Sequence, residues 1–158
     1  MIILFFGQPA SGKTTLADAL YDEIWGESAS AAIRIDGDKW REVTRNTDYS
    51  KEGRVRNLKN AFDMALYLEK SDYVPILSFV TPYEELRSYL RQNAKNLVEI
   101  YLEYNEDRGR NMNFAKDFEQ PCEKYLSLNT SYTSIDDCLD KIMDYLFENG
   151  KIENYEME

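Results

Sequence analysis

A phosphate-binding loop is the clearest chemical signal in this sequence. Residues 7–14 read GQPASGKT and match the pattern G-x-x-x-x-G-K-[ST]. In such a loop the backbone N–H groups surround phosphate oxygens, the lysine reaches the β and γ phosphates, and the threonine hydroxyl binds Mg²⁺. A lysine so placed also assists phosphoryl transfer, so it is a candidate catalytic residue. We expect the triphosphate of a nucleotide, ATP or GTP, to be bound by one contiguous set: Gly7, Gln8, Pro9, Ala10, Ser11, Gly12, Lys13, Thr14 and Thr15.

Two aspartates in the sequence DGD are candidates for metal binding and proton transfer. Asp36 could hold Mg²⁺ through a bound water, and Asp38 could accept the proton of an attacking hydroxyl. The chain has no histidine, so chemistry at neutral pH must use carboxylates, cations, hydroxyls and backbone. The alternative is a turn at Asp-Gly in which Asp38 merely caps the next helix.

Cations cluster between residues 39 and 56, although the chain as a whole is acidic. The formal net charge is -10, from 29 acidic and 19 basic residues. Arg41, Arg54 and Asn57 would give a charge-matched grip on an anionic acceptor, and Tyr49 could stack on a base. The alternatives are a solvated basic face and a tyrosine buried in the core.

The chain predicts a parallel α/β fold that can position these groups. Apolar runs at 2–6, 31–35, 74–80, 97–103 and 125–130 are typical of buried strands, and amphipathic helices are expected between them. We expect helices over 14–25, from Ser50 onward, from Thr81-Pro82 to about Ala94, and from Ser134 to Glu148. The fold class is thus a P-loop NTPase fold, with a parallel sheet of about five strands and helices on both faces. The DGD sequence would end the second strand, beside the first, where ligands bind in such sheets.

Length and composition predict one domain over 1–148 and an acidic tail over 149–158. No apolar run approaches 18 residues and no basic leader opens the chain, which favours a cytoplasmic protein without membrane contact. Cys122 and Cys138 are expected to be reduced and mostly buried. The negative charge argues against binding of nucleic acid.

Four stretches together resemble the adenylylsulfate kinase family. They are GQPASGKTT, IDGDKWR, YSKEGRVRNLKN and LSFVTPYEELR, and the resemblance extends over about residues 1–103. It implies transfer of the γ-phosphoryl group of ATP to the ribose 3′-hydroxyl of adenosine 5′-phosphosulfate (APS), with Mg²⁺. It places Asp38, Arg41, Arg54 and Asn57 on substrate positions and Tyr49 on the base-stacking aromatic position. Ser78 matches a serine that carries a phosphoryl group in some members; the alternative is a hydroxyl that ties up a strand end.

The chain departs from that family after residue 103. The family continues with a lysine-rich lid, KGLYKKA, and a second base-stacking phenylalanine, whereas this chain has the shorter EYNEDRGRNMNFAKDFEQP. Arg108 and Arg110 could replace lid cations, and Phe114 or Phe118 the second ring.

Short chains of this kind also resemble cytidine diphosphoramidate kinases. The alternatives are therefore a kinase for another 5′-substituted nucleotide, a kinase for some other alcohol or a polynucleotide end, and a non-catalytic nucleotide sensor. The expected partners are ATP and a small anionic nucleotide, with a homodimer as a further option.

Overall fold

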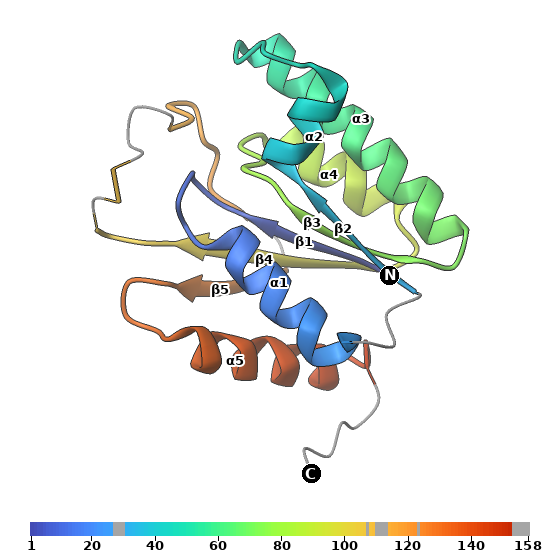
Figure 1. Ribbon diagram of the computed structural model, residues 1–158, viewed down its shortest axis with the longest axis vertical. Helices are drawn as coiled ribbons and strands as arrows, with labels where there is room; N and C mark the ends of the chain where they lie inside the picture. The colour runs from blue at the N-terminus through green and yellow to red at the C-terminus, as the bar shows by residue number, and fades with distance from the viewer. Residues whose placement is uncertain (27–30, 107, 110–113, 123, 153–158) are drawn as a thin grey trace.

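Five parallel strands form the sheet at the centre of the molecule (Figure 1). The computed structural model describes residues 1–26, 31–106, 108–109, 114–122 and 124–152. The strands lie in the order β2-β3-β1-β4-β5, and each neighbouring pair is parallel. Their bounds are β1 Ile2–Phe6, β2 Ala32–Asp36, β3 Val74–Ser78, β4 Leu97–Glu103 and β5 Leu126–Asn129. The α/β class predicted from the alternating pattern is confirmed.

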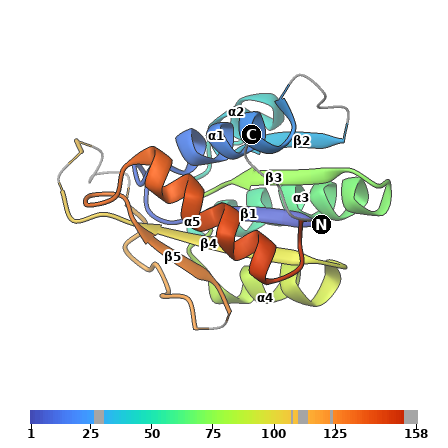
Figure 2. The same ribbon diagram turned by 90° about the horizontal axis from the view of Figure 1, so that it is seen from below.

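Helices cover both faces of the sheet, as the two views show (Figures 1 and 2). Helices α1 and α5 lie on one face, and α3 and α4 on the other. The bounds are α1 Lys13–Ile24, α2 Gly37–Thr44, α3 Lys51–Lys70, α4 Glu84–Asn93 and α5 Ile135–Glu148. Within the described residues no helix is both long and apolar enough to span a bilayer.

Strand β1 separates two hydrophobic cores and contributes to both. Its side chains are fully buried, and they alternate between the faces of the sheet. Ile2, Leu4 and Phe6 join the core beneath α3 and α4, whereas Ile3 and Phe5 join the core beneath α1 and α5. Burial on both faces explains why this strand is a continuous apolar run rather than an alternating one.

Two predicted helix caps are confirmed. Ser50 Oγ accepts the N–H of Gly53 at 3.1 Å, and Ser134 Oγ accepts the N–H of Asp137 at 3.1 Å. Each hydroxyl satisfies one of the N–H groups that a helix leaves unpaired at its start.

The predicted start of α4 is wrong. The helix begins at Glu84 rather than Pro82, and Thr81 is not its cap. Instead, Thr81 is buried with a left-handed φ of 46°, and the Glu84 N–H donates to the Glu119 carboxylate at 2.5 Å. The guanidinium of the fully buried Arg87 donates to the Thr81 carbonyl at 2.8 Å and to the Glu119 carbonyl at 2.7 Å. Contacts from a distant segment therefore override the local Thr-Pro signal.

Three further expectations need correction. Strand β2 is not beside β1, because β3 lies between them. The third strand ends at Ser78 rather than Val80. Of the two free cysteines, Cys138 is buried but Cys122 is exposed. The predicted acidic tail lies outside the described residues from 153 onward.

Candidate functional site

One cavity of about 670 Å³ opens where β1, β2 and β3 end, as expected for the carboxyl edge of a parallel sheet. Most of the predicted site residues line it: Pro9, Ala10, Gly12, Lys13, Thr14, Thr15, Asp36, Asp38, Arg41, Tyr49, Arg54, Asn57 and Ser78. Gly7, Gln8, Ser11 and Phe114 are not among the lining residues. The sequence motifs thus converge on one space although they come from four segments of the chain.

The phosphate loop runs from the end of β1 into α1. Gly7 opens it with φ of 143°, and a Cβ at this position would overlap the carbonyl oxygen of Leu102 at the end of β4. Gly12 has φ of 95° and immediately precedes α1. Lys13 Nζ donates to the Gln8 carbonyl at 2.7 Å and to Ser11 Oγ at 3.3 Å. The ammonium group therefore lies within the loop that would surround a phosphate chain.

Asp36 joins the phosphate loop to the neighbouring strand ends. Its Oδ2 accepts hydrogen bonds from Thr14 Oγ1 at 2.7 Å and from Ser78 Oγ at 2.9 Å. Its Oδ1 accepts the N–H groups of Asp38 at 3.1 Å and of Lys39 at 3.3 Å. Burial disfavours the charged carboxylate, but these hydrogen bonds outweigh it and lower the pKa of Asp36 below its ordinary value. Asp36 is therefore a carboxylate at neutral pH.

These contacts bear on two of the alternatives drawn from the sequence. Asp36, not Asp38, is the N-cap of α2. Ser78 is buried, and its hydroxyl holds Asp36 at the end of the adjacent strand, in line with the strand-end alternative for this serine.

The paired oxygens of Thr14 and Asp36 fit a magnesium site. Mg²⁺ in nucleotide sites is usually held by one or two protein oxygens, with phosphate oxygens and waters completing the octahedron. In the described part of the chain no cluster of three or more acidic or cysteine side chains forms a complete metal cage. A hydroxyl and a carboxylate 2.7 Å apart beside the phosphate loop suit a metal that arrives with the nucleotide.

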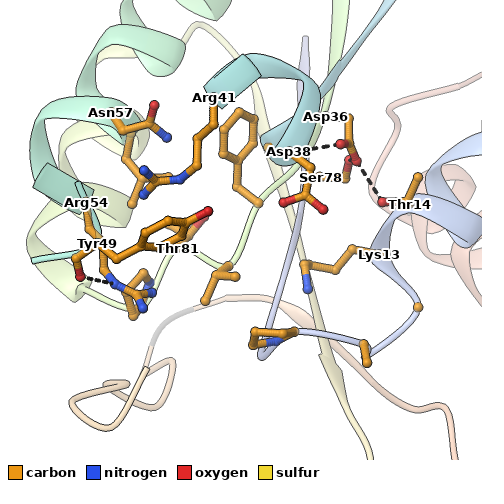
Figure 3. Close-up of a pocket in the computed structure, with 18 of the residues that line it drawn as sticks. Lys13, Thr14, Asp36, Asp38, Arg41, Tyr49, Arg54, Asn57, Ser78 and Thr81 are labelled. Atoms are coloured by element: carbon orange, nitrogen blue, oxygen red, sulfur yellow. Dashed lines mark hydrogen bonds between the residues drawn. The ribbon is translucent and has the colours of Figure 1, made fainter. Parts of the chain in front are cut away.

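Asp38 lies in the first turn of α2 and is exposed. Its carboxylate points into the space between Lys13 and the arginines (Figure 3). A hydroxyl bound in that space would lie beside a carboxylate that has no capping role in its own helix.

Arg41, Tyr49 and Arg54 form a group on the side of the cavity opposite Lys13 and the phosphate loop (Figure 3). The Arg41 guanidinium lies 4.2 Å from the centre of the Tyr49 ring, and Arg54 lies 5.9 Å from it. Arg41 Nη1 donates to Asn46 Oδ1 at 2.8 Å, and Arg54 Nε donates to the Tyr49 carbonyl at 3.1 Å. Tyr49 is 63% exposed, so it is not a core tyrosine.

The charge of Arg41 favours an anion in this group. Burial, together with the nearby charge of Arg54, lowers the pKa of Arg41 from its usual value. An arginine still stays protonated in proteins. Its cost of burial therefore falls when an anion binds beside it.

Two residues that line the cavity each carry a buried side-chain oxygen without a hydrogen-bond partner. These oxygens are Asn57 Oδ1 and Thr81 Oγ1. An unpaired buried polar atom is costly, so these two oxygens are candidates for a hydrogen bond to a bound ligand or water. Asn57 was predicted as a site residue. Thr81 was predicted only as a helix cap, and no pattern in the sequence indicates its role at the cavity.

The segment after β4 contributes one of its predicted groups to the cavity. Arg108 lines it, and Arg110 lies outside the described residues. Phe114 packs edge-on against Tyr104, with ring centres 6.1 Å apart, and Phe118 packs against Tyr101, with centres 6.0 Å apart. Neither phenylalanine ring lines the cavity.

Comparisons with known proteins show what this chain is similar to. The family model described as adenylylsulphate kinase matches residues 1–117. The adenylyl-sulfate kinase of Halothermothrix orenii is 28% identical over 169 residues, which cover 95% of the chain and 91% of that protein. The cytidine diphosphoramidate kinase of Campylobacter jejuni is 31% identical over 102 residues, which cover 65% of the chain and 59% of that protein.

A solved structure supports the fold. The Mycobacterium tuberculosis APS kinase, in complex with AMPPNP and APS, matches with a TM-score of 0.79. The match covers 92% of the chain and 96% of that structure, at 19% identity, so it bears on the fold alone.

Proposed function

The chain belongs to the adenylylsulphate kinase family, and we propose that it transfers the γ-phosphoryl group of ATP to the ribose 3′-hydroxyl of APS. It is an ATP-dependent kinase with an alcohol acceptor. One observation carries the proposal: a single cavity holds a phosphate loop on one side, two arginines and a tyrosine on the other, and Asp38 between them. That arrangement suits an anionic nucleotide whose hydroxyl faces the end of a triphosphate.

The roles of the individual residues follow from position and charge. Lys13 would balance the charge that builds up on the transferring phosphoryl group, and Thr14 and Asp36 would hold the Mg²⁺ bound to the triphosphate. Asp38 would orient the acceptor hydroxyl and take its proton.

The acceptor itself would be held by charge and by the unpaired buried oxygen. Arg41 and Arg54 would bind its anionic group, Asn57 would accept a hydrogen bond from a hydroxyl or amino group of the acceptor, and Tyr49 would stack on its base. In the structure Arg41 lies over the Tyr49 ring, so stacking of a base requires the guanidinium to share or leave that face.

A second acceptor class is supported by the similarity to a cytidine diphosphoramidate kinase. Such an acceptor is also a 5′-substituted nucleotide, so the same arginines could bind it. A homodimer and a cytoplasmic location stay predictions from the sequence.

A coupled ADP-release assay with Mg²⁺ and a panel of 5′-substituted nucleotides tests the proposal. APS should give the highest kcat/KM, and the cytidine compound is the comparison that would reassign the acceptor. ATP binding without turnover of any acceptor in the panel would favour the sensor alternative.

Arg54→Ala should raise the KM of the acceptor much more than that of ATP. Loss of a charge-assisted hydrogen bond costs about 1.5–3 kcal/mol, or roughly 10- to 150-fold in affinity. Lys59→Ala is the control, because this exposed lysine on the same helix does not line the cavity. Equal losses for ATP and acceptor would show that α3 supports the fold rather than the acceptor.

A further inference from the structure

Three successive carbonyls of the phosphate loop accept hydrogen bonds from side chains that are remote in the sequence. Tyr104 Oη, Arg108 Nη1 and Thr130 Oγ1 donate, at 2.6, 3.0 and 2.9 Å, to the carbonyl oxygens of Pro9, Ala10 and Ser11 respectively. We call these three donors the bracing residues. Tyr104 and Arg108 follow β4, and Thr130 follows β5, so the loop at the end of β1 is held from the next two strands of the sheet.

The bracing residues also hold one another. The Arg108 guanidinium lies 4.7 Å from the centre of the Tyr104 ring. Its Nη1 donates to Thr130 Oγ1 at 3.2 Å, and its Nη2 donates to the Thr130 carbonyl at 2.8 Å. The three side chains therefore form a connected unit rather than separate contacts.

Holding a carbonyl also orients the next N–H group, because each peptide unit is planar and its C=O and N–H point in opposite directions. The hydrogen bond from Tyr104 to the Pro9 carbonyl sets the Ala10 N–H. The bond from Thr130 to the Ser11 carbonyl likewise sets the Gly12 N–H. Backbone N–H groups are what such a loop presents to phosphate oxygens.

The loop needs outside support for its shape. Ala10 has a left-handed φ of 65°, which costs a non-glycine residue about 1–3 kcal/mol and persists only where its surroundings enforce it. The Gln8 carbonyl is held differently, since it accepts Lys13 Nζ at 2.7 Å and the Ser11 N–H at 3.3 Å inside the loop. The strained part of the loop is the part that receives the external hydrogen bonds.

We propose that Tyr104, Arg108 and Thr130 are positioning residues that preorganise the phosphate loop and so set the affinity for the triphosphate of ATP. Two of these residues, Tyr104 and Arg108, belong to the segment after β4, which thus holds the loop through its carbonyl oxygens, and Arg108 also lines the cavity. The same segment contacts the loop at a second place. The side-chain amide of Gln8 donates to the Ala115 carbonyl at 2.9 Å and accepts the Ala115 N–H at 3.0 Å. The proposal rests on ATP binding and is independent of the acceptor.

Calorimetric titration with AMPPNP and Mg²⁺ tests the proposal without turnover. Tyr104→Phe and Thr130→Val each remove one hydroxyl and keep the shape of the side chain. Tyr104→Phe should weaken AMPPNP binding about 5- to 10-fold, the range expected for one lost hydrogen bond. Thr130→Val should weaken it at least as much, because it also removes the hydrogen bond that Thr130 Oγ1 accepts from Arg108 Nη1. Thr130→Ser keeps the hydroxyl and should bind within twofold of the unaltered protein. Tyr132→Phe is the matched control, since this tyrosine is 77% exposed in the turn after β5.

Kinetics distinguish positioning from general support of the fold. The KM for ATP should rise in Tyr104→Phe while the KM for the acceptor and the thermal midpoint stay nearly unchanged. AMPPNP affinity within twofold of normal in Tyr104→Phe and Thr130→Val would overturn the proposal, as would Thr130→Ser binding as weakly as Thr130→Val. If Thr130→Val does not fold, Tyr104→Phe alone decides, because it removes a single oxygen atom. A failure of the proposed acceptor would leave these binding results unaffected.

Discussion

Asp38 is the carboxylate whose part in proton transfer can be separated from capping. Because Asp36 caps α2, Asp38→Asn should change the free energy of unfolding by less than about 0.5 kcal/mol. The asparagine keeps the shape and one acceptor oxygen but cannot take a proton. We expect kcat to fall about 10²-fold with little change in acceptor affinity. Steady-state kinetics and acceptor titration check this, and nearly normal turnover would remove Asp38 from the catalytic set.

Lys13 tests the charge that the loop supplies. Lys13→Ala should lower kcat about 10²-fold or more, because the ammonium group balances charge on the transferring phosphoryl group. Lys141→Ala removes the same charge from an exposed position on α5 and should leave kcat unchanged. A fixed-time assay of ADP release measures the kcat of both variants. Equal activity in the two would contradict a catalytic role for Lys13.

Contiguous motifs made some site residues predictable, and distance in the sequence hid others. The loop residues follow from a spacing in which each residue type has a backbone or phosphate role. The bracing residues have no such spacing, since 95 positions separate Tyr104 from Pro9 and 119 separate Thr130 from Ser11. A tyrosine or threonine after a strand is common, and only the strand order reveals what it reaches.

At the scale of elements, the first turn of α3 packs against the loop before it, and this loop carries Tyr49 on the acceptor side of the cavity. A Cβ at Gly53 would overlap Asp48, whose carbonyl accepts Arg41 Nη1 at 3.1 Å. A glycine-to-alanine change inside a helix normally stabilises by about 0.5–1 kcal/mol. Here the overlap with Asp48 should make the change to alanine destabilising instead.

We therefore expect Gly53→Ala to destabilise the protein by about 1–3 kcal/mol and to weaken acceptor binding by displacing the loop that carries Tyr49. Urea unfolding and the KM of the acceptor check the two effects. A more stable variant with normal acceptor binding would show that the loop yields easily.

The elements were predictable where a local signal dominates. Buried apolar runs located the strands, and Ser50 and Ser134 located two helix starts because a hydroxyl can cap only nearby N–H groups. The start of α4 could not be predicted, because the cap is a carboxylate 35 residues away and the Thr81 backbone is held by Arg87. The order of the strands could not be predicted from local patterns either. Strands β1 and β3 are similar apolar runs, so the sequence does not show which of them pairs with β2.

For the molecule as a whole, charge distribution matches the proposed ligands. The chain carries a net charge of -10, yet the cavity is lined by four cations, Lys13, Arg41, Arg54 and Arg108, against two carboxylates, Asp36 and Asp38. A positive cleft concentrates anions and raises their association rate. The remaining acidic surface disfavours large polyanions, so the charge pattern selects for small anionic ligands.

The stability of the protein should decrease at alkaline pH because of Tyr83. Tyr83 is buried, and burial, followed by its hydrogen bond to Asp117, raises the pKa of Tyr83 to about 12 from 10.0. A raised folded-state pKa gives stability that is present below about pH 10 and is lost as the pH rises toward 12.

The difference in unfolding free energy between the unaltered protein and Tyr83→Phe should therefore shrink above pH 10. The decrease is up to about 1.4 kcal/mol per pH unit, since each pKa unit corresponds to that amount. Urea titrations between pH 8 and 11 measure it. A constant difference would mean that the Tyr83 hydroxyl titrates normally in the folded protein.

The central place of β1 governs the order in which the chain can fold. Its sheet partners are β3 and β4, and α1, β2, α2 and α3 all precede β3 along the chain. During synthesis, the five apolar residues of β1 therefore have no strand partner until β3, Val74–Ser78, has been made. Sheets built from such non-local pairings fold slowly, and their unpaired apolar segments are exposed to aggregation. The strand that positions the phosphate loop in the finished enzyme is thus exposed to aggregation until β3 has been synthesised.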